Sequence, residues 1–322
     1  MPDMVKQVYC YNCSQELPLN EYYNIFYGAD NNICRALCTA MYSIHAHNKQ
    51  EPIVFHVISD GFAKENLAKF EEFANSYGIK LIIYIIEPGS LKNLRTSSHL
   101  PMATYFRFIG PEVIKADKLL YLDTDIFASN AQLKELFATN LEDKLAGAVM
   151  DAGWMVKKRS KILALKEEKY FNAGVLLLNV KLWNEYGVFA KVMTDLSNNR
   201  KKYTYFDQDA LNKILEGRIM YLPSKWNCYD VTKVQDGFVG LVHFTAHPKP
   251  WTIAWSYRQG ISSYAISLYA GYEACTPWKN AAPEEPKGAH VMRIYARMLW
   301  QAGEYGQWAV WYGKYLKAKF WL

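Results

Sequence analysis

The chain has 322 residues, of which 51% are hydrophobic, a size that fits one large α/β domain with an appendage or two smaller domains. Its net charge of +6 is too modest to indicate nucleic-acid binding, and no stretch approaches the roughly 20 uncharged apolar residues of a membrane span. Residues 1–17 lack the basic and apolar regions of a signal peptide. We therefore expect a cytoplasmic protein with reduced thiols.

Two cysteine pairs lie near the start of the chain. Cys10 and Cys13 form a CxxC pattern, and Cys34 and Cys38 form a CxxxC pattern. Four thiols at such spacing could bind zinc. Because Cys34 and Cys38 lie in a segment that we interpret as a buried helix, ordinary buried thiols are the favoured interpretation.

Strand and helix patterns alternate through the first half of the chain. Residues 1–23 have no clear period and are predicted to be an extension. Predicted strands cover residues 24–27, 52–59 and 81–86, with helices through about residue 48 and over 63–77, the second capped by Gly78. This order predicts a mostly parallel sheet covered on both faces, with ligands beyond the carboxyl ends of its strands.

The turn after the first strand has the sequence Gly28-Ala29-Asp30-Asn31-Asn32. It is not a GxGxxG sequence, so a standard dinucleotide site is not expected. A nucleoside could still approach the backbone here, with Asp30 accepting a hydrogen bond from a base or a ribose. Equally, Asp30 could cap the helix that follows.

Two carboxylates follow the apolar run of residues 119–122. Asp123 and Asp125 are separated by one residue, and side chains at i and i+2 of a strand point to the same side. Two converging carboxylates repel unless a cation lies between them, and hard oxygen ligands favour Mg²⁺ or Mn²⁺. The alternative is that two acidic residues simply begin a surface turn.

Four further segments combine polar residues with predicted strands or helices. A strand over residues 145–150 ends at Asp151 and is followed by the basic residues 157–161, expected to be a solvated face. A strand over residues 171–179 begins with small and polar residues. Asp207-Gln208-Asp209 opens a helix, where acidic residues also have an electrostatic explanation. A last strand, at residues 241–244, precedes a loop that contains Lys249.

The composition changes after about residue 261. Residues 287–322 contain six Lys or Arg and one Glu, so that six minus one gives +5 of the net charge of +6. Aromatic residues follow each other at helical spacing, namely Trp308, Trp311, Tyr312 and Tyr315. A basic helix with such a face predicts binding to an anionic membrane surface. The alternative is an aromatic helix packed on the main domain.

Six motifs in this order resemble those of the retaining glycosyltransferases of family 8, in the branch that builds the lipopolysaccharide core. The motifs are Phe26–Asn32, Thr104-Tyr105-Phe106-Arg107, Tyr121–Asp125, Phe171–Val175, Asp207-Gln208-Asp209 and the loop from His243 to Trp251. The resemblance runs from about residue 24 to the C-terminus. It implies a GT-A fold, with an extension at 1–23, a catalytic domain at 24–260 and an acceptor- or membrane-binding region at 261–322.

The resemblance also implies a UDP-sugar donor and a Mn²⁺ or Mg²⁺ ion. The implied metal ligands are Asp123, Asp125 and His243. The implied uridine pocket consists of Gly28, Ala29, Asp30 and Asn32. Lys249 would meet the diphosphate. Thr124 and Ala246 complete the implied cofactor-binding residues. Ala246 lies near a position, before the Lys, where the family often has Gly. The residues around the donor sugar would be Arg107, Asp151, Asn172, Ala173, Asp207 and Gln208.

The implied reaction moves glucose or galactose from a UDP-sugar to a hexose of the lipopolysaccharide outer core and keeps the α configuration. Because an amide is a poor nucleophile, front-side attack is favoured over a double displacement, with Gln208 stabilising charge while Asp209 and Asp151 orient hydroxyls. The acceptor would lie at the cytosolic face of the bacterial inner membrane, and residues 157–161 could meet its phosphates. No nucleic acid is implied.

Three alternatives are weaker. A haloacid-dehalogenase-type phosphatase also has an apolar strand that ends in DxD, but it usually has Thr or Val where this chain has Phe127. A sugar-binding protein without activity would be expected to lack a metal ligand. A transferase that glucosylates proteins or itself is the nearest rival within the family.

Overall fold

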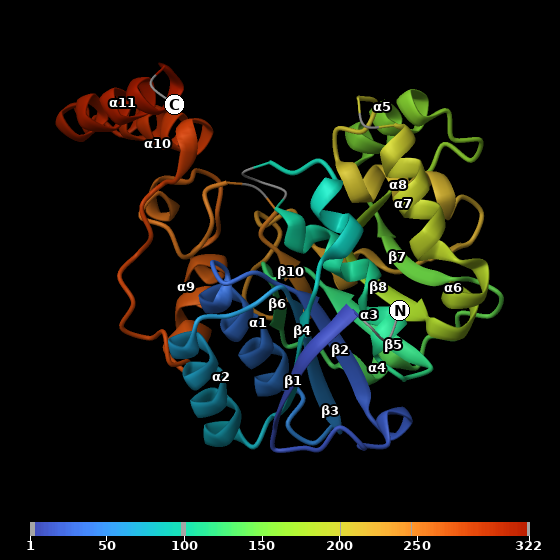
Figure 1. Ribbon diagram of the computed structural model, residues 1–322. Coiled ribbons are helices and arrows are strands. Elements are labelled where there is room, and N and C mark those ends of the chain that lie inside the picture. Colours follow the sequence, from blue (N-terminus) through green and yellow to red (C-terminus); the bar gives the residue numbers. More distant parts are fainter. Residues whose placement is uncertain (1–3, 98–100, 200, 246, 321–322) are drawn as a thin grey trace.

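The computed structural model describes residues 4–97, 101–199, 201–245 and 247–320. Its main sheet is built from β1 (Val5–Tyr11), β2 (Tyr23–Gly28), β3 (Ile53–Ser59), β4 (Lys80–Ile86), β5 (Lys118–Leu122), β7 (Ala146–Met150), β8 (Phe171–Asn179) and β9 (Ile219–Tyr221). Within the described residues these strands lie in the order β1-β4-β3-β2-β5-β8-β7-β9 (Figure 1). Strands β4, β3, β2 and β5 are parallel, which confirms the predicted mostly parallel arrangement.

Two parts of the sheet differ from a simple alternation of strand and helix. Strand β8 runs antiparallel to both of its neighbours, β5 and β7. Strand β1 pairs antiparallel with β4 at the edge, within the residues 1–23 that were predicted to be an extension with no clear period. All side chains of β1 are exposed or half-buried, so no alternating apolar pattern marks this strand in the sequence.

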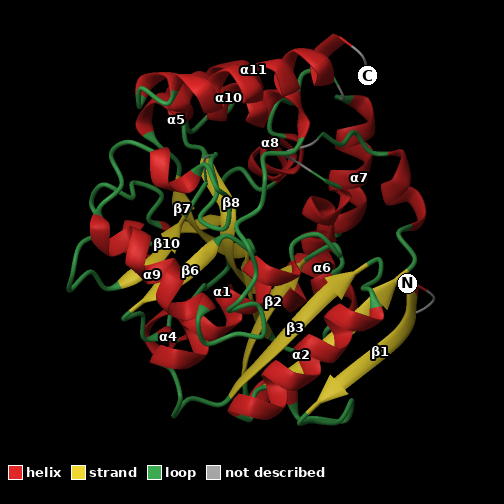
Figure 2. Ribbon diagram, turned by 90° about the vertical axis from the view of Figure 1, so that its left-hand side faces the viewer, coloured by secondary structure: helices red, strands yellow, loops and turns green. Residues whose placement is uncertain are grey.

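Both faces of the sheet are covered because its strands alternate apolar side chains between two cores. On β5, Leu120 and Leu122 enter one core, and Leu119 and Tyr121 enter the other. The first core is covered by α1 (Cys34–His47) and α2 (Lys64–Tyr77). The second is covered by η4 (Met102–Phe108), α6 (Val180–Tyr186), α7 (Val188–Asn198) and α8 (Phe206–Ile214) (Figure 2).

A smaller sheet lies against the first core. It consists of β6 (Ile126–Ser129) and β10 (Gly240–His243), which pair antiparallel. The remaining helices of the main body are α3 (Gly110–Val113), α4 (Leu133–Phe137), α5 (Gly153–Leu163) and α9 (Ser263–Glu273). Because only three residues separate the end of β5 from the start of β6, the smaller sheet holds β10 beside the end of β5.

The predictions for the first two helices are confirmed. Cys34 and Cys38 are buried in α1, and burial raises the pKa of the Cys34 thiol to about 12. Gly78 follows α2 in the left-handed conformation, with φ of 65°, where a glycine costs least.

The region after residue 260 divides into two parts. Helix α9 belongs to the main core, and its Glu273 forms a buried ion pair with Arg35 of α1 (Nη2 to Oε2, 2.8 Å). Helices α10 (Gly288–Gln301) and α11 (Tyr305–Phe320) instead form a hairpin with a core of its own, packed on Ala254. The boundary at 260/261 stays a prediction, and α9, which lies just beyond it, packs on the main core.

The aromatic residues predicted to form one stripe on the C-terminal helix differ in burial. Trp311 and Tyr315 are buried, with Trp311 packed against Tyr295 of α10, whereas Tyr312 is 40% exposed. The two helices are separated by a turn at Gly303, which has φ of 80°. Within the described residues, no helix combines the length and the apolar character that a bilayer crossing requires.

Candidate active site

The two predicted metal-binding carboxylates lie in the turn that joins the two sheets. Strand β5 ends at Leu122 and β6 begins at Ile126, so Asp123, Thr124 and Asp125 form the connection. Backbone hydrogen bonds fix both ends: Asp123 N donates to Gly174 O at 2.9 Å, and Phe244 N donates to Asp125 O at 3.0 Å. The carboxylates do converge, but the reason is this tight turn and not the alternation of a strand.

His243 completes the cluster from the end of β10. Its Nε2 lies 3.1 Å from Asp125 Oδ1 and 3.8 Å from Asp123 Oδ2. Its Nδ1 lies 2.8 Å from Asn227 Oδ1, a carbonyl oxygen that can only accept, so we assign the proton to Nδ1 and the free lone pair to Nε2. One ligand atom from each of Asp123, Asp125 and His243 lies within 4.8 Å of the others. Two carboxylates and one imidazole suit Mn²⁺ or Mg²⁺.

The other oxygen of each aspartate is already engaged. Asp123 Oδ1 accepts from Arg107 Nη2 at 2.9 Å and from the Tyr121 hydroxyl at 2.6 Å. Asp125 Oδ2 accepts from Lys249 Nζ. Burial alone would raise the pKa of Asp125, but the Lys249 ammonium holds it well below its usual range. Asp123 Oδ2 and Asp125 Oδ1 are therefore left to face the His243 imidazole.

A glycine makes room for the imidazole. A Cβ atom on Gly174 would lie 2.4 Å from His243 Cε1 and 2.9 Å from its Nδ1. The backbone of Gly174 is in an ordinary conformation, so the requirement is for space and not for an unusual φ.

Helix α8 begins with two buried aspartates on opposite sides. Residues i and i+2 of a helix are about 200° apart, so Asp207 and Asp209 point away from each other. Asp207 Oδ2 lies 3.1 Å from Arg107 Nε, and Asp209 Oδ1 accepts from Arg159 Nε of α5 at 3.0 Å. Burial raises the pKa of Asp207 to about 6, although the Arg107 charge opposes this shift. The two ion pairs hold the first turn of α8 from both sides.

Gln208 lies between these aspartates and faces a different group of residues. Its Oε1 accepts from Ala173 N at 3.0 Å, and its Nε2 donates to Asp151 Oδ2 at 3.0 Å. Asn172 Nδ2 lies 3.4 Å from the same Asp151 oxygen. The structure thus brings together four of the residues predicted to surround the donor sugar.

This polar group is connected to the metal-binding cluster. Asn172 Oδ1 accepts from Asn227 Nδ2 at 2.9 Å, and Asn227 Oδ1 in turn accepts from His243. Asn227 was not predicted, because no motif surrounds it in the sequence and only the folded chain shows its neighbours. The space that Gly174 leaves for His243 and the hydrogen bond from Tyr121 were not predicted either, although both residues lie inside recognised motifs.

A family model for glycosyl transferase family 8 matches residues 24–254. The chain belongs to glycosyl transferase family 8. It is 29% identical to the lipopolysaccharide 1,3-galactosyltransferase of Salmonella typhimurium over 98% of this chain and 97% of that protein. It is also 29% identical to a lipopolysaccharide 1,2-glucosyltransferase of Escherichia coli, over 89% of this chain and 88% of that protein.

The fold agrees with this membership. The galactosyltransferase LgtC, solved with donor and acceptor sugar analogues, superposes with a TM-score of 0.69 over 79% of this chain and 96% of that chain, at 24% identity. The predicted GT-A fold is therefore confirmed.

Two residues of this family 8 chain are more enclosed than expected. Each oxygen of Asp209 already accepts at least two hydrogen bonds, from the donors Arg159, Tyr170, Thr204 and Tyr205. This differs from the expectation that Asp209 orients a sugar hydroxyl, since no acceptor position remains. Arg159 was expected on a solvated basic face. It is only 2% exposed, because its guanidinium group forms an ion pair with the buried Asp209.

The turn expected to line a uridine pocket contains tight local contacts. A Cβ atom on Gly28 would lie 2.7 Å from Ala103 O, so Gly28 permits η4 to pack closely. Asp30 Oδ1 accepts from Asn32 N at 2.8 Å in an Asx turn, while the residue that caps α1 is Ile33. Ala29 is buried. Ala246, part of the predicted diphosphate loop, lies outside the described residues.

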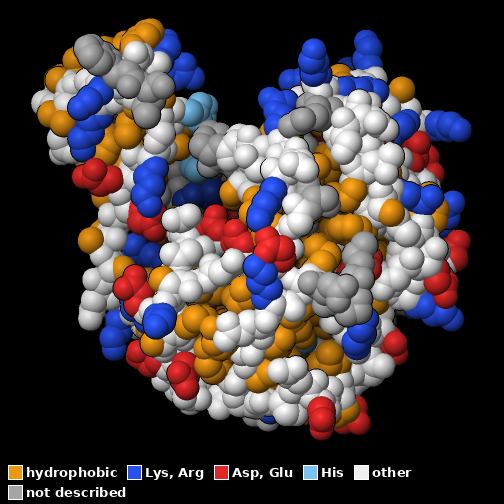
Figure 3. Space-filling view, in the orientation of Figure 1, with side chains coloured by type: hydrophobic (Ala, Val, Ile, Leu, Met, Phe, Trp, Pro, Cys, Tyr) orange, Lys and Arg blue, Asp and Glu red, His pale blue; other side chains and the backbone are white. Residues whose placement is uncertain are grey.

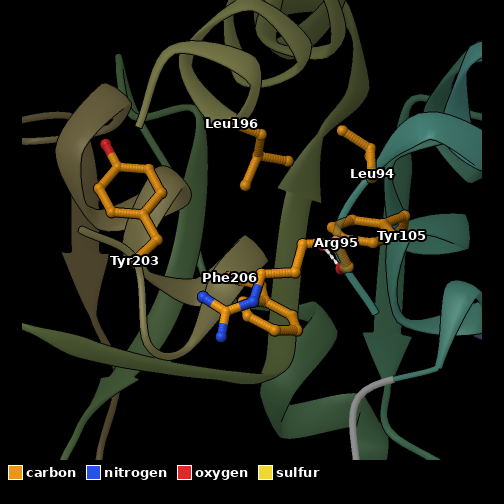
Figure 4. Close-up of a pocket in the computed structure, with 6 residues that line it drawn as sticks. All are labelled: Leu94, Arg95, Tyr105, Leu196, Tyr203 and Phe206. Atoms are coloured by element: carbon orange, nitrogen blue, oxygen red, sulfur yellow. Dashed lines mark hydrogen bonds between the residues drawn. The ribbon is translucent and has the colours of Figure 1, made fainter. Parts of the chain in front are cut away.

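A small pocket adjoins the start of α8 (Figure 4). It is lined by Leu94, Arg95, Tyr105, Leu196, Tyr203 and Phe206. Its volume of about 10 Å³ has room for about one water molecule. It is therefore too small for a sugar ring.

We expect Gly174→Ala to weaken metal binding by about tenfold or more, the scale seen when partners of metal ligands are displaced. The added methyl group would push the His243 ring away from Asp123 and Asp125. Titration of Mn²⁺ by electron paramagnetic resonance measures the effect. Gly271→Ala is the control, because a Cβ atom there has nothing within 4 Å. Unchanged Mn²⁺ affinity in Gly174→Ala would contradict the assigned geometry.

We expect Asp209→Asn to lower the free energy of unfolding by about 3–5 kcal/mol, because it leaves the Arg159 guanidinium buried without its counter-charge. Gln208→Ala should change the free energy of unfolding by under about 1 kcal/mol and reduce turnover instead. Urea denaturation followed by circular dichroism distinguishes the two, with the exposed Asp143→Asn as control. Full stability with lost turnover in Asp209→Asn would instead assign Asp209 to substrate contact.

Proposed function

We propose that this chain is a metal-dependent transferase that moves glucose or galactose from a UDP-sugar to the lipopolysaccharide outer core and retains the α configuration. The observation that carries the proposal is the hydrogen-bonded connection, through Asn227 and Asn172, between the metal-binding cluster and the Asp151–Gln208 pair. The family match and the names of the relatives support a lipopolysaccharide acceptor, and the family match weighs against a phosphatase.

The metal would be held by Asp123 Oδ2, Asp125 Oδ1 and His243 Nε2. A bound Mn²⁺ or Mg²⁺ neutralises charge that develops on the departing UDP. Lys249 supplies a second positive charge beside Asp125, where a diphosphate would need it. Gly28, Ala29, Asp30 and Asn32 would line the uridine site, with Thr124 between the two metal-binding carboxylates.

The donor sugar would lie against Asp151, Asn172, Ala173 and Gln208. The hydrogen bond from Ala173 N holds the Gln208 amide, so its NH₂ group points to Asp151. A neutral amide is a weak nucleophile, and this arrangement favours front-side attack, with Asp151 orienting a hydroxyl. Arg107 and Asp207, both buried, would keep these groups in place rather than react.

We further propose that the C-terminal hairpin binds the anionic cytosolic face of the inner membrane. Six large hydrophobic side chains of the hairpin are at least 37% exposed, namely Trp300, Tyr305, Val310, Tyr312, Leu316 and Phe320. In α11, Tyr305, Tyr312, Leu316 and Phe320 are seven, four and four residues apart, so these four lie on one side of the helix, whereas Val310 lies on another side. The hairpin projects from the main body, with Lys and Arg side chains among its apolar ones (Figure 3).

We expect slow, metal-dependent release of UDP from one of two donors, UDP-glucose or UDP-galactose, in the absence of an acceptor. Release should require Mn²⁺ or Mg²⁺, stop with EDTA and be lost in Asp125→Asn, while Asp143→Asn behaves as wild type. No release and no calorimetric binding of either donor would overturn the proposal. An intact-mass spectrum after the same incubation should show unmodified protein, whereas an added hexose would favour a double displacement or self-glucosylation.

We expect simultaneous Ser substitution of Trp300, Tyr312, Leu316 and Phe320 to reduce binding to anionic liposomes by about tenfold or more, since each side chain loses its apolar transfer energy. Deleting residues 287–322 should also release the protein, but the deletion uncovers Ala254 and Tyr257, so the substitutions are the cleaner test. Ser substitution of the exposed Val239 and Ile266 is the control. Undiminished sedimentation with liposomes would defeat the anchor, and UDP release should be spared throughout.

A further inference from the structure

Helix α5 presents one exposed face next to the proposed donor site. The helix begins at Gly153, two residues after Asp151. Trp154, Lys157, Lys158 and Lys161 follow at positions i, i+3, i+4 and i+7, so they share one side of the helix. All four are exposed, and Trp154 is 65% exposed. The opposite side, with Met155, Arg159, Ser160 and Leu163, is buried.

The three lysines of this face have no acidic neighbours on their own helix. Helix α5 contains neither Asp nor Glu. Within the described ranges, no ion pair or hydrogen bond engages the side-chain amines of Lys157, Lys158 and Lys161. Like charges three and four residues apart on a helix repel each other. A bound anion would relieve this repulsion, and a face with three ammonium groups suits a ligand with phosphate groups.

The face is held in a fixed position relative to the donor site. The buried ion pair between Arg159 and Asp209 joins α5 to α8, and the neighbouring Gln208 contacts Asp151. Asp151 also accepts from Ala152 N, immediately before the helix, at 2.7 Å. Trp154 therefore lies in the first turn of a helix that starts beside Asp151 and whose buried side is held by Asp209, the residue next to Gln208.

The surroundings leave space for a large ligand. Helix α5 and the α10–α11 hairpin lie at the same end of the molecule (Figure 1), and the space-filling view is hollowed between them (Figure 3).

We infer that Trp154, Lys157, Lys158 and Lys161, the α5 face, bind a phosphate-bearing oligosaccharide acceptor. The flat apolar surface of Trp154 would stack on a sugar ring near the transfer point, and the three lysines would meet phosphates farther along the saccharide. This inference rests on the proposed function and adds to it the surface that selects the acceptor. Anionic lipid head groups carry the same charge, but the position of Trp154 beside Asp151 favours the saccharide.

The test uses the full-length enzyme, the UDP-sugar that it hydrolyses, and lipid-free core oligosaccharide before and after removal of its phosphates with hydrogen fluoride. The variant K157Q/K158Q/K161Q should raise the KM for the phosphorylated acceptor by about tenfold or more, at a few-fold for each lost charge pair. Its KM for the stripped acceptor should stay at the wild-type value. Trp154→Ala should raise both KM values, with partial rescue by Trp154→Phe.

The control variant K64Q/K134Q/K213Q removes the same charge from exposed lysines elsewhere and should behave as wild type. UDP release without acceptor should be unchanged in all variants, which separates acceptor binding from donor chemistry. A wild-type KM for the phosphorylated acceptor in the α5 triple variant would overturn the inference. Lost liposome binding with an unchanged acceptor KM would also overturn it, in favour of lipid head groups.

Failure of the proposed function would be seen separately. If the wild-type enzyme hydrolysed neither donor, calorimetric titration of the two oligosaccharides into the same variants would still test the α5 face. Weaker binding of the phosphorylated form to K157Q/K158Q/K161Q than to the lysine control would support it. Equal binding to both would overturn it.

Discussion

The guanidinium group of Arg107 connects the parts of the active site. Its Nη2 donates to Asp123 in the turn that joins the two sheets, its Nη1 donates to Ala173 O of β8, and its Nε lies against Asp207 of α8 and Thr104 O of η4. Burial would lower the pKa of Arg107, but Asp207, Tyr121 and Asp123 keep it above its ordinary value. A buried cation is tolerated only when its donors are satisfied by anions and carbonyl groups. The four elements must therefore meet at this one group.

This requirement separates the residues that hold the site from those that remain available to a substrate. Arg107 forms an ion pair with Asp207 on one side of the site. On the other side, Arg159 forms an ion pair with Asp209. Asp151 and Gln208 lie between these pairs with partly exposed side chains. The two ion pairs hold Asp151 and Gln208 in place. Polar groups that do not have to reorient during a reaction are effective at stabilising the charge that develops in it.

The regions at the rim are attached to the same framework. Helix α5 is fixed through Arg159, and the hairpin packs on Ala254, a few residues after Lys249. The basic, aromatic helix α5 and the aromatic α10–α11 hairpin are thus both attached to the framework of the candidate site. This architecture suits an enzyme whose donor is a small soluble nucleotide sugar and whose acceptor is large, anionic and bound to a membrane.

The sequence by itself determined the strands β2 to β5, the Gly78 cap, the family and the candidate metal ligands Asp123, Asp125 and His243. These features depend on local patterns: apolar runs, turn residues and short motifs that keep their spacing in any fold. Packing was decided only in the tertiary structure. The edge strand β1, the inward position of Arg159, the closed environment of Asp209 and the role of Asn227 all depend on partners far away in the chain. The same holds for the aromatic stripe of α11, since helical spacing places Trp311, Tyr312 and Tyr315 on neighbouring sides of the helix but does not say which of them meets another helix. Even the convergence of Asp123 and Asp125 was predicted for a different reason, because a strand and a tight turn can both bring residues i and i+2 together.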